Sequence, residues 1–445
     1  MQAELHLASV SVGGRVGARL RRILPGLLMA ASRGAAVGLQ FLAQIAVGGL
    51  AGPAGLGVLQ LFTSWSCILG EIIALGLPAR AMRISAINWS RREVSGTAQE
   101  LDRAAWLILK VAVCLAAGFA LVMWLTASSG HGPTASFTGL ILVATLLAAP
   151  LFALSRVGAE ALKGTDATLP AISLESLLAP LVILLVSAIC WLLAYRLTNM
   201  ALLLAGLAGF SVTALFLWWA LQRRLKEVSK TDAVALPALA FRRDLAALWG
   251  TSVLSIGFLH LPFLVLPWYA GTDEVGIYAV AHKLVNIVTT LLILMAAVFG
   301  PAFARAAAEA DRRELGVLLW RTQWISLAIF TPLVLVLLLA SEPLAAVFSV
   351  PADTLRAFLL ALTAGQLVNA ATGLPGVLLN MSGAAELELR ALLVSLALVT
   401  LAAPLVGESY GALGLAWLFS AALAFKNLAS HLLAGFHLMR IGKQP

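Results

Sequence analysis

Charged side chains are scarce in this sequence, and the motifs of several enzyme classes are missing from it. Only 11% of the 445 residues are charged and 61% are hydrophobic, whereas roughly a quarter of the residues of a soluble domain carry a charge. The sequence contains no G-x-x-x-x-G-K-[ST] segment for nucleotide phosphates, no H-E-x-x-H zinc segment and no G-x-S-x-G nucleophile turn. These absences weigh against a soluble enzyme and against nucleotide hydrolysis as the energy source, and they leave no candidate catalytic residue.

Cysteine is rare as well. The three cysteines, Cys67, Cys114 and Cys190, each lie alone in an apolar stretch, a pattern that predicts neither a disulfide framework nor a metal site. The six histidines are scattered along the chain. We therefore expect no metal ion and no bound cofactor, and any energy input would come from a proton or sodium gradient or from the substrate itself.

Long runs of Leu, Ala and Val dominate the sequence instead. A helix needs about 20 mostly apolar residues to cross a membrane, and these runs lack the period-two alternation of a barrel strand. We therefore predict an all-α polytopic membrane protein with about 12 transmembrane helices. The predicted spans are residues 24–50, 58–79, 104–127, 136–162, 170–194, 199–221, 247–270, 276–302, 321–340, 355–381, 387–406 and 411–437.

Positive charges indicate how these spans are oriented. Most of the 30 Lys and Arg residues lie in every second connection, starting with the arginine-rich N-terminus, and cytoplasmic loops are the ones enriched in such residues. The pattern predicts that both termini are cytoplasmic and that the first apolar stretch is an uncleaved helix. This topology also accounts for the net charge of +9, so we expect no binding to nucleic acid.

Two similar segments indicate an internal duplication. AGPAGLGVLQLF (51–62) and AGTDEVGIY (270–278) share Ala-Gly, four residues, Gly and a β-branched residue, and Gly57 and Gly276 are 219 residues apart. We expect a tight, uncharged turn at the first segment. Two halves of six spans each would have the same topology, which predicts two parallel six-helix lobes with a substrate between them. The predicted division is an N-terminal lobe (1–221), a cytoplasmic linker (222–246) and a C-terminal lobe (247–445).

Several ionisable residues fall inside the predicted spans. A charge at the bilayer centre costs at least ~2.5–3.5 kcal/mol, so such a residue usually faces a cavity or a partner. Arg156 and Glu160 are four residues apart on one helix face, which also fits an interfacial ion pair. Arg33, Lys283 and Lys426 also fit side chains that reach water from near a helix end. The remaining residues of this kind are Glu71, Glu175, His260 and His282. For Glu71 the alternative is a buried carboxyl that is protonated or bonded to its helix, and for His260 it is a packed histidine.

Cations outnumber anions among these residues, which favours an anionic cargo. Arginine offers a planar fork of donors that suits phosphate, and lysine offers a point charge. We expect a cationic, water-filled cavity that holds a phosphate or pyrophosphate headgroup while an apolar tail stays in lipid. The candidate substrate contacts are Arg33, Lys283, Lys426 and Arg156, and the candidate ion-coupling residues are Glu71 and Glu175.

Three stretches carry a resemblance to a known family. The segment at 47–62 with LGLPARAMRISA (75–86), the segment at 270–315 with its "vGiY" start, and the segment at 365–396 followed by YGALGLAWLFSAAL (410–423) together resemble the polysaccharide flippases. These are the Wzx-type transporters of lipid-linked sugars in the multidrug/oligosaccharidyl-lipid/polysaccharide (MOP) exporter superfamily. The sequence departs from the pattern where Leu56 and Leu59 replace aromatic residues and where Ala384-Ala385 replaces a histidine-containing pair. The matching positions are Gly52, Gly57, Gly276, Tyr278, Pro301, Pro375, Gly383 and Glu386.

The resemblance implies a fold and a function. The fold would be MATE/MOP-like, and the function would be a secondary transporter that flips an undecaprenyl-pyrophosphate-linked oligosaccharide across the bacterial inner membrane by alternating access. The cargo would be a unit of O-antigen, capsule or exopolysaccharide, and the partners would be membrane lipids, a polysaccharide polymerase and glycosyltransferases. The alternatives are a cation-coupled multidrug exporter of the same fold, a membrane-embedded polysaccharide polymerase or ligase, and a scaffold or sensor.

Overall fold

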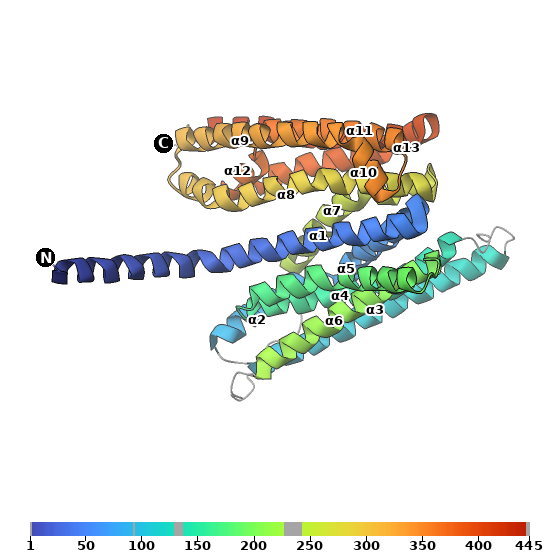
Figure 1. Cartoon of the computed structure of the whole chain (residues 1–445), viewed down its shortest axis with the longest axis horizontal. Helices are drawn as coiled ribbons and strands as arrows, with labels where there is room; N and C mark the ends of the chain where they lie inside the picture. The colour runs from blue at the N-terminus through green and yellow to red at the C-terminus, as the bar shows by residue number, and fades with distance from the viewer. Residues whose placement is uncertain (1, 92–93, 129–136, 227–242, 442–445) are drawn as a thin grey trace. The chain divides into compact units, whose positions relative to one another are not determined.

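The computed structural model describes residues 2–91, 94–128, 137–226 and 243–441, and within these ranges the backbone is helical without a β-strand (Figure 1). The prediction of an all-α membrane protein is confirmed. Apolar segments of this length form helices because a helix satisfies its backbone hydrogen bonds without water. The elements are α1 (Gln2–Ala74), α2 (Leu77–Arg91), α3 (Val94–Ser128), α4 (Phe137–Gly164), α5 (Thr168–Leu192), α6 (Asn199–Lys226), α7 (Arg243–Val265), the short 3-10 helix η1 (Leu266–Trp268), α8 (Thr272–Ala308), α9 (Arg312–Leu339), α10 (Ser341–Phe348), α11 (Ala352–Thr372), α12 (Pro375–Met381) and α13 (Ala385–Ile441).

Seven of the described helices are long and apolar enough to cross a membrane. Two of them, Ala31–Ala74 with 44 residues and Ala385–Arg440 with 56 residues, exceed the about 20 residues of a single crossing. Each contains one glycine with non-helical backbone angles, Gly52 in α1 and Gly411 in α13. The chain is therefore a multi-pass membrane protein in which α1 and α13 are each long enough for two spans. The other five are Gly139–Gly164, Thr168–Leu192, Asn199–Lys226, Arg312–Leu339 and Ala352–Thr372.

The tight turn expected between the first two predicted spans is a kink at one residue. Across residues 51–57 the helix continues and only Gly52 leaves the helical region, with φ 67° and ψ −170°. Glycine adopts this conformation without the steric cost that a Cβ would impose, and Pro53 suits the first turn of the helix that follows. The similar segment at 270–278 forms a different connection, because η1 precedes it and α8 begins only at Thr272.

Two predicted spans end earlier than the sequence suggests. The helix predicted at 58–79 ends at Ala74, and the basic segment after it forms a separate helix, α2. The single span predicted at 355–381 is wrong, because α11 stops at Thr372 and α12 starts at Pro375. Proline lacks the N–H of a continuing helix and is favoured in a first turn, so the chain breaks directly before it.

Packing divides the chain into two compact units. The residues around the Gly52 kink group with the second half of the chain, although they belong to α1. Unit 1 is Met1–Ala46 with Phe62–Gly257, and unit 2 is Val47–Leu61 with Phe258–Pro445.

These packing units are a different division from the lobes predicted from the sequence. In the segment that we expect to link the lobes, α6 continues to Lys226 and α7 begins at Arg243. Residues 227–242 lie outside the described residues. The lobe boundaries at 1–221 and 247–445 therefore stay a prediction.

Small residues let α1 and α4 approach each other closely in unit 1. Ala149 and Ala153 of α4 are fully buried, and a Cβ added at Gly70 of α1 would lie 2.9 Å from the Ala149 carbonyl oxygen. Contact at this distance leaves room only for glycine. It fixes the end of α1 against α4 and brings the next residue, Glu71, to within 3.9 Å of an α4 arginine, Arg156.

A hydroxyl group joins α13 to α11 in unit 2. The Ser420 hydroxyl accepts a hydrogen bond from the Gly365 N–H at 2.8 Å and donates one to the Ala361 carbonyl oxygen. Because these two backbone groups pair with each other in a regular helix, Ser420 inserts into the hydrogen-bond ladder of α11. A side chain at Gly365 would collide with Ser420, so this junction depends on a small residue.

Candidate functional site

A cluster of charged side chains lies inside unit 1. One face of α4 carries Arg156, Glu160 and Lys163, which are spaced by four and then three residues, so they line up along the helix. The segment around them is otherwise apolar, with Val157, Ala159, Ala161 and Leu162 buried in the core of the unit. The three charged side chains therefore lie at the edge of an apolar core.

Arg156 is the centre of this cluster. Its Nη1 atom lies 2.8 Å from Oε1 of Glu175 on α5 and 3.6 Å from Oε1 of Glu160. Its Nε atom lies 3.9 Å from Oε2 of Glu71 on α1. One guanidinium thus connects three helices, α1, α4 and α5, and its charge is shared among three carboxylates.

Lys163 supplies the second positive charge. Its Nζ atom lies 2.8 Å from Oε1 of Glu160 and 3.4 Å from Oε2 of Glu175. Glu175 therefore bridges the arginine and the lysine with its two carboxylate oxygens. Three carboxylates face two cations in the cluster formed by Glu71, Arg156, Glu160, Lys163 and Glu175, which leaves an excess of one negative charge.

Glu71 is the most enclosed member of this ionic cluster. It is 2% exposed, and its Oε2 atom has no hydrogen-bond partner among the described residues. The Ser252 hydroxyl on α7 hydrogen-bonds to the Glu71 carboxylate, and Trp249 on α7 donates from Nε1 to the Ile72 carbonyl oxygen at 3.2 Å. The carboxylate is thus held in place by α7, and its Oε2 atom accepts no hydrogen bond from a described residue although Nε of Arg156 lies 3.9 Å away.

Unit 2 contains a second group of ionisable side chains, around the start of α8. His282 stacks on Tyr278, with ring centroids 5.9 Å apart, and meets Phe263 edge-on at 5.4 Å. His260 and Lys283 both interact electrostatically with His282. Among the described residues no carboxylate lies within ion-pair distance of Lys283. Lys283 therefore gives this group one formal positive charge, whereas the cluster of unit 1 has an excess of one negative charge.

The remaining predicted cations have different surroundings. Lys426 on α13 forms an ion pair with Glu388 from the same kinked helix, and both side chains are largely buried. Arg33 is exposed on α1; its neighbour Ser32, not the arginine, contacts α5 through a 2.7 Å hydrogen bond between the hydroxyls of Ser32 and Ser173. The structure therefore brings Arg156, Glu71 and Glu175 together and places Arg33, Lys283 and Lys426 in three other environments.

The motif residues lie mostly at helix packing contacts and helix ends. Tyr278 is fully buried among the aromatic rings of Phe263, Phe358 and Phe419. Glu386 is exposed and pairs with Arg390 at 2.7 Å. The others are Gly52 at the kink, Gly57 and Gly276 in a close helix contact, Pro301 within α8, Pro375 at the first turn of α12 and Gly383 at φ 78° before α13.

Three contacting residues were missed by the sequence reasoning. Lys163 is three residues beyond Glu160 and in line with it, so helical spacing could have found it. Ser252 and Glu388 carried no such signal, because their partners are far away in the sequence. Among the side chains that the structure describes, no group of three or more His, Cys, Asp or Glu residues is arranged to hold a metal ion.

Comparison with known proteins identifies the family of the chain. The model of a family described as "Polysaccharide biosynthesis protein" matches residues 26–307 of the chain. The chain belongs to this polysaccharide biosynthesis protein family. No curated protein sequence matches it. The predicted family resemblance is thereby confirmed.

Solved structures show that this family member has the MOP superfamily fold. An inward-facing multidrug resistance MATE family transporter of the MOP superfamily has 17% identity and a TM-score of 0.73, and the match covers 92% of this chain and 96% of the other. A MOP superfamily transporter from Pyrococcus furiosus, described as having a binding pocket of reversed polarity, has 16% identity, a TM-score of 0.59 and 95% coverage of both chains.

A flippase has the same fold. The lipid II flippase MurJ in an inward closed conformation has 10% identity and a TM-score of 0.63, with 93% of this chain and 90% of the other covered. Similarity at these identities shows the fold alone, and the prediction of a MATE/MOP-like fold is confirmed. Family and fold together are those of a multi-pass membrane transporter.

Proposed function

We propose that the protein flips a lipid-linked oligosaccharide across the bacterial inner membrane, with undecaprenyl pyrophosphate as the lipid carrier. Membership of the polysaccharide biosynthesis protein family supports a role in assembling surface polysaccharide. The fold shared with a lipid II flippase supports a lipid-linked cargo. Glycosyltransferases and a polysaccharide polymerase would act on the same cargo. Both termini of the protein would be cytoplasmic.

The observation that carries this proposal is the cation Lys283 in the first half of α8. Lys283 is partly buried on α8 and has no carboxylate partner among the described residues, and it lies next to His282 and close to His260. A partly buried cation at membrane depth without a partner is costly unless a ligand neutralises it. A pyrophosphate group would supply the missing negative charge, and Lys283 would bind it as a point charge.

Transport would follow from unequal binding in two conformations. A ligand shifts a conformational equilibrium only by its difference in affinity for the two states. In the state open to the cytoplasm, Lys283 would bind the pyrophosphate. The apolar carrier would stay in the lipid. The bilayer core is as apolar as the helix surface, so the carrier gains nothing by moving from the lipid to the protein.

The ionic cluster of unit 1 is the proposed site of energy coupling. Its excess of one negative charge would be neutralised by one proton or one sodium ion. Glu71 has a buried oxygen without a hydrogen-bond partner among the described residues, so it is the proposed acceptor. Glu175 would respond indirectly, because it shares Arg156 with Glu71.

Export measured in cells tests the proposed cargo. Deleting the gene should abolish surface polysaccharide and leave lipid-linked precursor on the inner leaflet, and a Lys283→Ala variant should reproduce this phenotype at normal membrane abundance. Lys283→Arg should retain partial export because it keeps the charge. The matched control is Lys110→Ala, which removes an exposed lysine of α3 and should export normally. Normal export by Lys283→Ala would contradict the proposed contact.

A second candidate function is the export of organic cations. The carboxylate excess in the ionic cluster of unit 1 favours it, since a cationic drug would be attracted to Glu71. Drug susceptibility separates the two functions. A deletion strain that becomes drug-sensitive and keeps its surface polysaccharide would support the drug exporter and contradict the flippase.

A further inference from the structure

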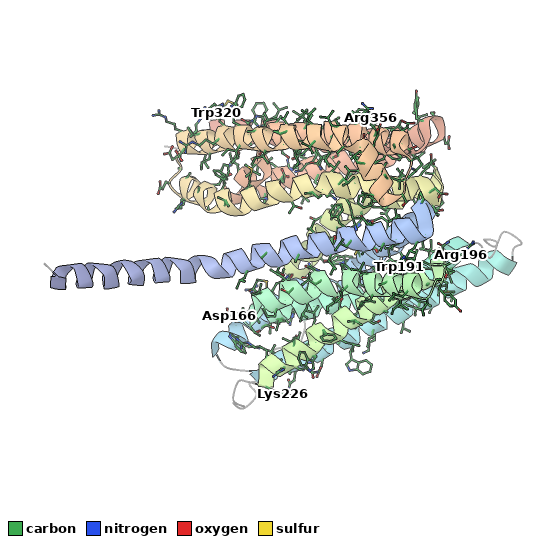
Figure 2. All side chains as sticks on the ribbon, viewed as in Figure 1. Asp166, Trp191, Arg196, Lys226, Trp320 and Arg356 are labelled. Carbon is green, nitrogen blue, oxygen red and sulfur yellow. The ribbon has the colours of Figure 1, made fainter. Side chains whose placement is uncertain are left out.

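One end of unit 1 combines basic, aromatic and amphipathic features. The last turn of α6 carries Arg223, Arg224 and Lys226. Figure 2 shows Lys226 and Asp166 at this end of the unit, whereas Trp191 and Arg196 lie at the opposite end. The helix α2 reaches the same end, because the Arg224 guanidinium on α6 lies 4.8 Å from the centre of the Trp89 ring on α2.

The helix α2 is amphipathic and firmly attached. Its inner face buries Leu77, Ala81 and Ser85, while Met82 and Ile87 on the outer face are 45% and 41% exposed. The attachments to neighbouring helices are an ion pair from Arg80 to Glu100 at 3.3 Å, a hydrogen bond from Asn88 to Thr97 at 3.0 Å, and close packing of the Met82 backbone on Gly164 of α4. An amphipathic helix fixed in this way presents its outer residues as a permanent surface.

Aromatic rings mark this end as a membrane–water boundary. Trp219 on α6 is 57% exposed, and the Arg223 guanidinium lies 5.5 Å from the centre of its ring. Tryptophan is enriched at membrane interfaces because its ring is apolar and its N–H is polar. The cations that follow Trp219 along α6 would therefore lie at the depth of the lipid headgroups.

Among the residues of this end that the structure describes, the exposed positive charges exceed the exposed carboxylates. Arg83 on α2, Arg223 and Lys226 are exposed and form no ion pair with any other described residue. Asp102 and Asp166 are exposed carboxylates of the same unit. A net positive surface beside exposed apolar residues attracts anionic lipid. The exposed Met82 and Ile87 favour lipid over an anionic soluble partner, because such a partner would bind through the charges alone.

We infer that this surface, formed by Arg83, Arg223 and Lys226 with Trp219, Met82 and Ile87, binds the headgroups of anionic phospholipids. The phosphates would contact the three cations, and the upper acyl segments would lie against the apolar side chains. Such binding would hold α2 at the bilayer surface and stabilise this end of unit 1. The inference does not rest on the proposed cargo, because it concerns the protein without cargo.

Lipid titration of the purified full-length protein tests this surface. Phosphatidylglycerol or phosphatidylcholine is added to the protein in detergent, and the retained lipid is counted by native mass spectrometry. We expect phosphatidylglycerol to bind more tightly than phosphatidylcholine. Each basic residue near an anionic lipid surface contributes about fivefold in affinity. Arg223→Gln with Lys226→Gln should therefore weaken phosphatidylglycerol binding about 25-fold, and Arg83→Gln alone about fivefold.

The matched control removes the same charge elsewhere. Arg196→Gln with Arg356→Gln replaces two exposed arginines, one of them at the opposite end of unit 1 (Figure 2), and should leave phosphatidylglycerol binding unchanged. An equal loss in this control would overturn the inference and show that lipid binding follows net charge only. Unchanged binding in the Arg223→Gln/Lys226→Gln variant would overturn it as well.

Discussion

Gly57 and Gly276 lie at a close, reciprocal contact between α1 and α8 within unit 2. A Cβ at Gly57 would overlap the carbonyl oxygen of Thr272, and a Cβ at Gly276 would overlap the carbonyl oxygen of Pro53. The offset of 219 residues that relates the two glycines also relates Pro53 to Thr272. Gly57 therefore touches Thr272, and Gly276 touches Pro53, which is the counterpart of Thr272 in the first segment. The two contacts are equivalent, as in a two-fold interface. The two similar segments pack on each other, which supports a duplicated origin.

Adding one methyl group at this contact should be destabilising. Gly57→Ala and Gly276→Ala place a Cβ against backbone atoms, which cannot move aside as a side chain can. Overpacking of this kind costs about 1–3 kcal/mol, and we expect a lower thermal unfolding midpoint in detergent for each variant. The double variant should cost less than the sum of the two, because one separation of the helices relieves both clashes.

Glycines with free space around them provide the control for this contact. Gly49→Ala and Gly271→Ala should unfold at nearly the wild-type temperature, since nothing lies within 4 Å of a Cβ at either position. If these variants lose as much stability as Gly57→Ala, the effect comes from the loss of glycine in general and not from the reciprocal contact.

Removing Arg156 should be far more costly than removing one of its partners. Arg156→Met leaves Glu71, Glu160 and Glu175 with Lys163 as the remaining cation of the cluster. Breaking a buried ion pair from one side costs about 3–5 kcal/mol, because the remaining charge is left uncompensated. Adding Glu175→Gln to Arg156→Met should restore part of the stability, as measured by a thermal double-mutant cycle. A simple sum of the two losses would show that the cluster does not act as a unit.

The pair of Lys426 and Glu388 should prove structural. Lys426→Ala leaves a largely buried Glu388 without its cation, which we expect to lower stability by about 3–5 kcal/mol. Glu388→Gln in the same protein should recover most of that loss. Export by the stable double variant separates the roles: normal export would mean that Lys426 supports the fold, whereas lost export would support the sequence-based expectation of a cargo contact.

The helices could be predicted from the sequence because hydrophobicity alone defines them, but their breaks could not. Pro150 and Pro180 lie inside α4 and α5, while Pro375 begins a new helix. Proline by itself therefore does not decide between a kink and an end. The span predicted at 355–381 breaks at Gly373, which has a positive φ. Gly373 packs against α9, and the local sequence does not indicate this contact.

The site was predictable where the helical repeat brings residues together. Arg156 and Glu160 were paired from their spacing alone, and Lys163 follows the same rule. Long-range partners were different: Glu71 and Glu175 were recognised as buried charges, yet their common partner emerged only from the packing of α1, α4 and α5. Such pairings depend on which helix faces meet, and a single sequence does not specify that.

Glu71 should determine how the protein responds to the coupling ion. In the wild type, a proton or sodium ion that binds the carboxylate excess would stabilise the folded state by mass action, so the thermal unfolding midpoint should depend on pH or on sodium concentration. Glu71→Gln removes the carboxylate whose Oε2 atom accepts no hydrogen bond among the described residues and leaves two carboxylates facing Arg156 and Lys163. The variant should keep its fold and lose this dependence. Glu386→Gln, which alters an exposed carboxylate of unit 2, should respond as the wild type does. A variant at Glu71 that still responds to the same ion would place the coupling site elsewhere in the chain.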